Sequence, residues 1–87
     1  PAAIAQFDLG AVCYGICLAA WERGLGTVIN GQGVMQSVVV REHANIPDDQ
    51  NILTCIAMGY ADEEFSANSI KSRRALNQDF VSYIGFE

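Results

Sequence analysis

The longest uninterrupted apolar stretch of the sequence runs from Leu9 to Trp21 and contains no charged residue. Asp8 precedes this stretch and Glu22 follows it. Asp8 is a suitable N-cap, because its carboxylate can accept hydrogen bonds from the free amides of a first helical turn. Gly24 suits the position just after a helix, where a left-handed backbone favours glycine. The pattern therefore predicts a helix of about four turns that is capped at both ends.

The side chains on the different sides of this predicted helix differ in size but not in polarity. One side carries small residues and the other sides carry larger apolar ones. The small set is Ala11, Gly15 and Ala19, and the larger sets are Val12, Ile16 and Ala20, and Tyr14, Leu18 and Trp21. A helix that is apolar all round is normally buried all round. Because 87 residues are too few to surround it, we expect it to pack against something outside this chain.

Two further elements are predicted in the first half of the chain. Residues 25–29 form a short β-prone segment set among glycines. Residues 34–43 carry apolar side chains at helical spacing and predict a helix, although the β-branched run 38–40 weakens that pattern. Asn45 and Pro47 are expected to end this helix.

The second half of the chain is less regular. Residues 47–49 predict a turn, and the nearly continuous apolar run 52–59 predicts a strand that is covered on both faces. Residues 61–70 are acidic, then small and polar, and we expect them to form a surface excursion. Residues 75–87 are too apolar to extend into water, so we expect them to dock on the core or on a neighbouring subunit, in one alternative as a strand.

Composition narrows the classes of function. Apolar residues make up 51% of the chain, which excludes a disordered tail. The net charge of −5 argues against a nucleic-acid surface, which needs a basic patch. No apolar run reaches the length of a membrane span, and no basic segment precedes an apolar one, so we expect no membrane partner and no signal peptide. The chain begins with Pro1, which indicates a processed or partial piece of a longer protein.

The titratable side chains do not form a recognisable catalytic set. Cys13 and Cys17 are four residues apart on the predicted helix, but no second ligand pair lies near them, and buried structural thiols are the favoured interpretation for both and for Cys55. We therefore predict no metal site and a cytoplasmic protein. His43 is the single histidine, so no nucleophile–base pair and no catalytic side chain are predicted. An enzyme with this sequence would need a cofactor to carry the reaction.

Residues 24–33 are studded with glycine. Such a segment can bring its backbone amides and carbonyls close to a ligand. The alternative is a glycine-rich connection between a helix and a strand, and the pattern alone favours that alternative.

A basic cluster lies near the end of the chain, where three of the five Lys and Arg residues fall within residues 71–74. In an extended segment Lys71 and Arg73 share a side and Arg74 faces the other way. Two cations that converge on one point suit a phosphate. On spacing alone, however, the favoured alternative is a solvated basic stretch that balances the acidic residues 62–64.

Five short motifs follow one another in a recognisable order. In chain order they are Asp8-Leu9-Gly10-Ala11 with Leu18-Ala19-Ala20 and Gly24-Leu25-Gly26-Thr27; Val40-Arg41-Glu42-His43 with Ile46-Pro47; Ile56-Ala57-Met58-Gly59-Tyr60; Lys71-Ser72-Arg73; and Phe80-Val81 with Gly85-Phe86. Together they resemble the FMN-dependent nitroreductase family over nearly the whole chain. The one local departure is Ala61, which stands where that family usually has proline.

The resemblance implies an α+β fold, with helices packed on a mostly antiparallel sheet, and an intertwined homodimer with FMN at its interface. Backbone at Ile29, Asn30 and Gly31 would meet the flavin ring near N5, and Lys71 and Arg73 would hold the FMN phosphate, with Arg74 as the alternative if the register slips by one. The implied reaction is ping-pong: NAD(P)H reduces the flavin, and a nitroaromatic, quinone or related acceptor then takes hydride from N5.

The chain also departs from the family in length. The family domain is about twice as long, and its first half supplies further strands and part of the FMN site. Residues 1–87 are therefore identified as a single partial domain, the C-terminal half of a nitroreductase-like protein, whose partner is a second copy or the missing N-terminal half. Two alternatives remain: the same fold acting as a flavin reductase, dehalogenase or dehydrogenase, and a non-enzymatic dimerising remnant that binds no flavin.

Overall fold

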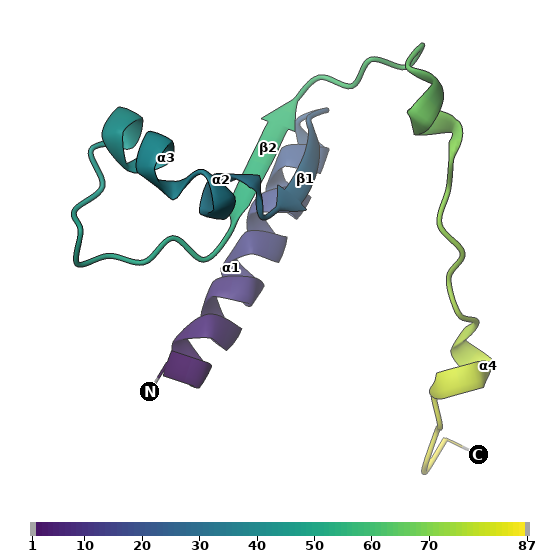
Figure 1. Cartoon of the computed structure of the whole chain (residues 1–87). Helices are drawn as coiled ribbons and strands as arrows, with labels where there is room; N and C mark the ends of the chain where they lie inside the picture. Colours follow the sequence, from purple (N-terminus) through teal and green to yellow (C-terminus); the bar gives the residue numbers. More distant parts are fainter. Residues whose placement is uncertain (1, 87) are drawn as a thin grey trace.

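The computed structural model describes residues 2–86, which form helices and one small antiparallel sheet. The elements in chain order are α1 (Ala2–Glu22), β1 (Gly26–Asn30), α2 (Gln32–Met35), α3 (Ser37–Ala44), β2 (Cys55–Gly59), the 3₁₀ helix η1 (Ser66–Ser69) and α4 (Asn77–Phe80). The fold is therefore α+β, as the sequence predicts. Figure 1 shows that α1 and the β1–β2 pair lie side by side, whereas the chain after β2 leaves them on a path of its own.

Helix α1 is longer than the sequence pattern predicts. It begins at Ala2, so Asp8 lies inside the helix and is not its N-cap. The alanine-rich residues before Asp8 explain the difference, because alanine has the highest helix propensity. By length and composition α1 could span a membrane, so the expectation that no segment reaches that length is wrong; core helices of soluble proteins meet the same criterion.

The C-terminal end of α1 is the one that the sequence predicts. Gly24 has a left-handed backbone with φ of +78°. Its amide donates to the carbonyl of Trp21 (3.0 Å), and the amide of Leu25 donates to the carbonyl of Ala20 (2.9 Å). These two bonds make a Schellman motif. The motif turns the chain directly into β1, which places the strand back along the helix.

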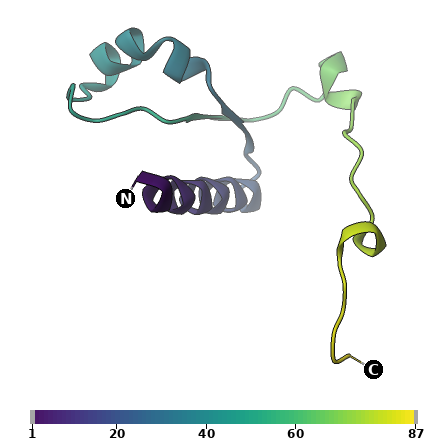
Figure 2. The ribbon, with the colours of Figure 1, turned by 60° about the horizontal axis from the view of Figure 1, so that its bottom comes forward.

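The sheet consists of β1 and β2, paired antiparallel from Gly26 opposite Gly59 to Asn30 opposite Cys55. Figure 2 shows α1 below this pair and the α2–α3 segment above it. Side chains alternate between the two faces of a strand. Ile29 faces α1, whereas Cys55 faces α2, where it lies against Gly33. Helices α1 and α2 thus contact the small sheet from opposite sides.

The helix predicted over residues 34–43 is divided in two. Gln36 has φ of −109° and ψ of 37°, outside the helical region, and it separates α2 from α3. The expectation of one continuous helix is therefore wrong, although the β-branched residues 38–40 are helical. Asn45 ends α3 in a left-handed conformation (φ of 54°), which confirms the predicted end. The predicted turn is also present, with the amide of Gln50 donating to the carbonyl of Pro47 (3.1 Å).

Strand β2 is shorter and more exposed than expected. It begins at Cys55 instead of residue 52, and its second half, from Ala57 to Gly59, is exposed. The expectation that both faces of this strand are covered is therefore wrong within this chain. Coverage of the kind that an apolar strand requires would have to come from elsewhere.

Residues 61–86 are almost entirely exposed, and they include η1 and α4. Their large apolar side chains remain in water: Phe65, Ile70, Leu76, Phe80, Tyr83, Ile84 and Phe86. The predicted surface excursion over residues 61–70 is confirmed. The alternative that the C-terminal segment docks on its own core is wrong, and docking on a neighbouring subunit stays a prediction.

The dimensions of the molecule show how little of it is packed. Its radius of gyration is 17.5 Å, whereas a compact domain of this length has one of about 12 Å. Its accessible surface is 8049 Å², against about 5,000 Å² for a folded monomer of this mass. In the described chain the buried apolar residues are Cys13 and Ala20. The apolar surface left in water is larger than a soluble monomer normally tolerates.

Candidate functional site

The turn that joins β1 to α2 is the part of the predicted site with the clearest local structure. Asn30, the last residue of β1, holds this turn with its own side chain. Its Oδ1 accepts a hydrogen bond from the amide of Gln32 (3.0 Å), and its Nδ2 donates to the carbonyl of Val28 (3.2 Å). Asparagine favours turns because it can make such bonds to its own backbone. The two polar groups of the Asn30 side chain are therefore both bonded to nearby backbone.

A second strand also holds this turn. The hydroxyl of Thr54, the residue before β2, donates to the carbonyl oxygen of Asn30 (3.1 Å) in a partly buried position. Sequence analysis did not single out Thr54, because the bond depends on the register of two strands that are 24 residues apart. No local pattern around residue 54 signals it.

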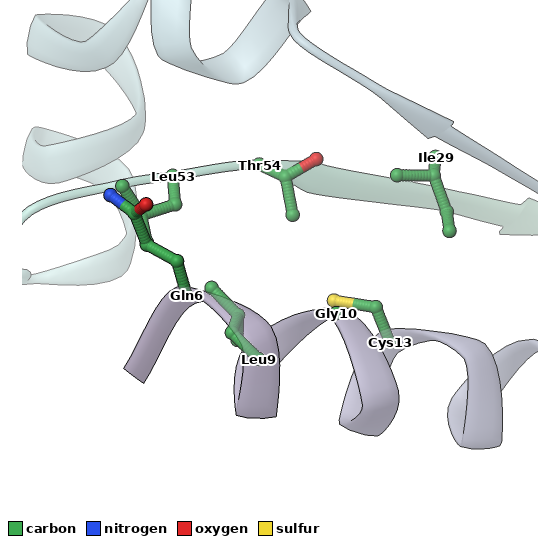
Figure 3. Close-up of a pocket in the computed structure, with 7 residues that line it drawn as sticks. All are labelled: Gln6, Leu9, Gly10, Cys13, Ile29, Leu53 and Thr54. Atoms are coloured by element: carbon green, nitrogen blue, oxygen red, sulfur yellow. The ribbon is translucent and has the colours of Figure 1, made fainter. Parts of the chain in front are cut away.

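A pocket of about 410 Å³ lies between α1 and the sheet, directly beside this turn. Ile29, Leu53 and Thr54 line it from the sheet side, and Cys13 lines it from the helix (Figure 3). In Figure 3 the methyl group of Thr54 points toward α1, while its hydroxyl points away from the helix. The lining is mostly apolar. Ile29, predicted from the sequence as a flavin contact, thus has its side chain in this pocket.

The glycines of residues 24–33 have different roles. Gly24 ends α1, and a Cβ added at Gly33 would meet Cys55 at its Sγ and, at 3.3 Å, its Cβ, so these two glycines serve the connection and the packing. Gly31 has neither role: its φ of −98° does not require glycine, and a Cβ added there would find no atom within 4 Å, as is also the case at Gly24. Open space of this kind over a backbone allows close approach of a flat ligand. The role as a connection is therefore confirmed at Gly24 and Gly33, and ligand contact at Gly31 stays a prediction.

The basic residues Lys71, Arg73 and Arg74 are exposed and lie in a segment without regular structure. The residues that flank it, Ile70 and Leu76, have extended backbones, and the alternation of side chains within residues 71–74 stays a prediction. Both ribbon views place this segment on the separate path that follows β2, away from the β1–α2 turn (Figures 1 and 2). Within one chain, the structure does not bring the two halves of the predicted site together.

The cysteines are free thiols that lie apart from other metal ligands. Cys13 is buried under the sheet, and Cys17 and Cys55 are half-buried. Among residues 2–86, no group of three or more His, Cys, Asp or Glu side chains comes together as a metal site would require. The placement agrees with a packing role for Cys13 and Cys55.

Comparison with known proteins gives a consistent set of matches. Residues 1–60 match the model of the nitroreductase family. The chain is 33% identical over 78 residues to a chloronitrobenzene nitroreductase of Comamonas testosteroni. This match covers 84% of this chain and 34% of that protein. It is 29% identical over 80 residues to a 4-nitrobenzoate reductase of Pseudomonas putida, covering 92% of this chain and 35% of that protein.

A third relative is a nitrobenzene nitroreductase of Ectopseudomonas oleovorans, 32% identical over 78 residues, with 84% of this chain and 34% of the relative covered. The chain spans about a third of the length of these relatives, a smaller share than the half expected from the sequence. The comparison with solved structures gives no significant match.

Proposed function

The chain belongs to the nitroreductase family, and from this premise we propose that it is one part of an FMN-dependent NAD(P)H oxidoreductase. The three relatives are named for reducing chloronitrobenzene, 4-nitrobenzoate and nitrobenzene. We therefore take nitroaromatics, with quinones or related compounds, as the acceptor class. FMN, when bound, supplies the hydride chemistry in two half-reactions, one with NAD(P)H and one with the acceptor. The chain's own residues bind and orient the reactants.

The observation that carries this proposal is the turn at the end of β1, residues 29–31, in which Ile29 and Gly31 are exposed and Asn30 is half-buried. Its backbone is held from behind by Thr54 and by the side chain of Asn30. Its front is open at Gly31, where no atom lies within 4 Å of an added Cβ. A rigid backbone edge with open space before it suits a flat aromatic ring that accepts hydrogen bonds. The residues present therefore fit the ring of a flavin.

The phosphate is assigned to Lys71 and Arg73. Two charge-assisted contacts suit a phosphate group. Because their segment lies apart from the turn in one chain, we propose that a complete site needs a second contributor. That contributor is a second copy in an intertwined homodimer, or the N-terminal part of the relatives that lies outside this chain, which makes residues 1–87 a partial, C-terminal portion of the domain.

The outer side of α1 supports an assembly. Its large apolar side chains are exposed, among them Phe7, Tyr14, Leu18 and Trp21. The surplus surface of about 3,000 Å² over a folded monomer is in the range that obligate interfaces bury. Asp8 lies inside α1, and a carboxylate within a membrane span is costly. We therefore propose a protein partner, not a membrane, and a cytoplasmic enzyme.

The proposal is tested by titrating FMN into the purified chain and measuring flavin fluorescence and the flavin absorbance band. Lys71→Ala and Arg73→Ala should each raise the Kd for FMN at least about tenfold, because each removes a charge-assisted contact worth about 1.5–3 kcal/mol. Arg74→Ala removes the same charge from the same segment and should leave the Kd within about twofold.

Other outcomes separate the alternatives. An effect at Arg74→Ala with none at Arg73→Ala would shift the register by one residue. Unchanged affinity in all three variants would defeat the phosphate assignment. A dimeric wild-type chain that stays colourless at high FMN concentration would favour the non-enzymatic remnant.

A further inference from the structure

The peptide group between Asn30 and Gly31 is held at one end by a side chain from the other strand. Its carbonyl oxygen accepts the hydroxyl hydrogen of Thr54 at 3.1 Å. Residues 2–86 contain no cis peptide bond, so the carbonyl and the amide of this group point in opposite directions. Holding the carbonyl inward, toward Thr54, therefore fixes the Gly31 N–H outward.

Gly31, which carries the amide of this peptide group, lies at the surface. Gly31 is exposed, and no atom lies within 4 Å of an added Cβ. The other hydrogen bonds of the turn use different amides: Gln32 donates to Asn30 Oδ1, and Val34 and Met35 donate to the carbonyl of Gly31. Gly31 takes part in these bonds through its carbonyl oxygen, and its N–H points away from Thr54.

We propose that Thr54 is a positioning residue, which aims the Gly31 N–H at a hydrogen-bond acceptor on the ring of the bound flavin. This inference rests on the proposed function, because it assigns the flavin to that side of the turn. Thr54 does not touch the flavin; it acts through the Asn30–Gly31 peptide group. Preorganised backbone donors stabilise developing negative charge without reorganisation, so the orientation of this amide affects both binding and reactivity.

Threonine suits this position because its hydroxyl and its methyl group make two different contacts. Its hydroxyl bonds to Asn30, while its methyl group lines the pocket above α1 (Figure 3). Thr54→Val keeps the branched shape and removes the hydroxyl. Thr54→Ser keeps the hydroxyl and removes the methyl group. The two variants therefore separate orientation of the turn from packing against α1.

The experiment compares the full chain with Thr54→Val, Thr54→Ser and the control Thr27→Val. Thr27 lies in β1, and the same substitution there removes a hydroxyl from the same strand pair without touching the Asn30 carbonyl. Two quantities are measured: the Kd for FMN, with the flavin absorbance spectrum, and the hydrogen-exchange rate of the Gln32 amide in the flavin-free chain.

Thr54→Val should raise the Kd about tenfold, which corresponds to about 1.4 kcal/mol, the scale of a partly buried carbonyl left without its partner. It should also shift the flavin spectrum and speed exchange at Gln32 about tenfold. Thr54→Ser and Thr27→Val should stay within about twofold of wild type in both measurements.

Each other outcome overturns the inference or the proposed function separately. Equal effects of Thr54→Val and Thr54→Ser would show a packing role and overturn the inference, as would unchanged FMN binding in Thr54→Val. A wild-type Gln32 amide that exchanges like an unstructured peptide overturns it as well. A dimeric wild-type chain that binds no FMN counts against the proposed function and leaves the exchange measurement to decide the inference. If exchange at Gln32 is then unaffected by Thr54→Val, the hydrogen bond from Thr54 to Asn30 does not hold the turn, and the inference is overturned as well.

Discussion

The chain on either side of Tyr60 carries many large apolar side chains, but the two parts place them differently. Residues 2–60 bring α1, the two strands and α2 into contact, bury Cys13 and Ala20 and half-bury several others. Residues 61–86 are similarly rich in aromatic and aliphatic side chains, yet Ile84 is 88% exposed and Phe86 is 81% exposed. The family model matches residues 1–60, the same part that packs.

The difference shows which apolar side chains pack against other elements of the same chain and which do not. In residues 2–60 (the first part), the Schellman motif at Gly24 turns β1 back along α1, so the helix packs against a sheet of the same chain. In residues 61–86 (the second part), no turn brings the chain back to the sheet. The outer side of α1 resembles the second part, because it is equally apolar and equally exposed. Both surfaces have the character of a subunit or domain interface.

Deletion of residues 70–87 should have the largest effect on assembly and a small effect on the fold of the first part. The deleted segment carries five of the exposed large apolar side chains beyond Ile70 itself. Each contributes about 1.5–3 kcal/mol when buried in an interface, so self-association should weaken at least about a hundredfold. Sedimentation measures the association, and circular dichroism measures the helix and strand content.

The full-length variant with Phe80→Ala and Phe86→Ala is the matched control and should weaken association in the same direction by a smaller factor. Loss of the α1 and sheet signal on deletion would contradict the comparison, because it would show that the second part packs on the first.

Gly33→Leu should destabilise the fold of the first part and leave the second part unaffected. A Cβ at Gly33 would already meet the Sγ and Cβ atoms of Cys55, so a leucine overfills the contact between α2 and β2. Overpacking of this kind lowers the free energy of unfolding by about 1–3 kcal/mol. Urea unfolding measures it. The double variant with Cys55→Ala should recover part of the loss; if it recovers none, the collision with Cys55 is not the cause.

Much of the first part was predictable because its signals are local. Gly24, Asn45 and the turn after Pro47 were identified from residue type alone, since each depends on its own φ or its own hydrogen bond. The N-terminal end of α1 was misplaced, because an aspartate can cap a helix or sit exposed within one. The break at Gln36 was missed for a related reason: the apolar spacing on both sides of it is helical.

The candidate site was predictable in part for the same reason. Asn30 and Gly31 are turn residues, and the sequence placed them correctly at the end of a strand. Thr54 was not predictable, because its bond to Asn30 exists only after β1 and β2 pair in their observed register. The segment that carries Lys71 and Arg73 lies apart from this turn, so the proposed joint site needs an arrangement beyond one chain, which no local pattern encodes.

The test with the smallest expected effect uses two glycines with nearly the same φ, one in residues 2–60 and one in residues 61–86. Gly24 has φ of +78° and Gly85 has φ of +83°, and an added Cβ meets no atom within 4 Å at either position. Alanine in this left-handed region costs about 1–2 kcal/mol. Gly24→Ala should lower the free energy of unfolding by about that amount, because the Schellman turn unfolds together with α1 and the sheet.

Gly85→Ala should leave the unfolding of the same chain unchanged, because residues 61–86 contribute few packed contacts to the cooperative transition. Urea unfolding of the monomeric chain, followed by helix content, measures both variants side by side. If the second part docks on a partner subunit with Gly85 in its observed conformation, the cost reappears as weaker association at Gly85→Ala. Equal losses in the monomer would show instead that both parts unfold as one unit.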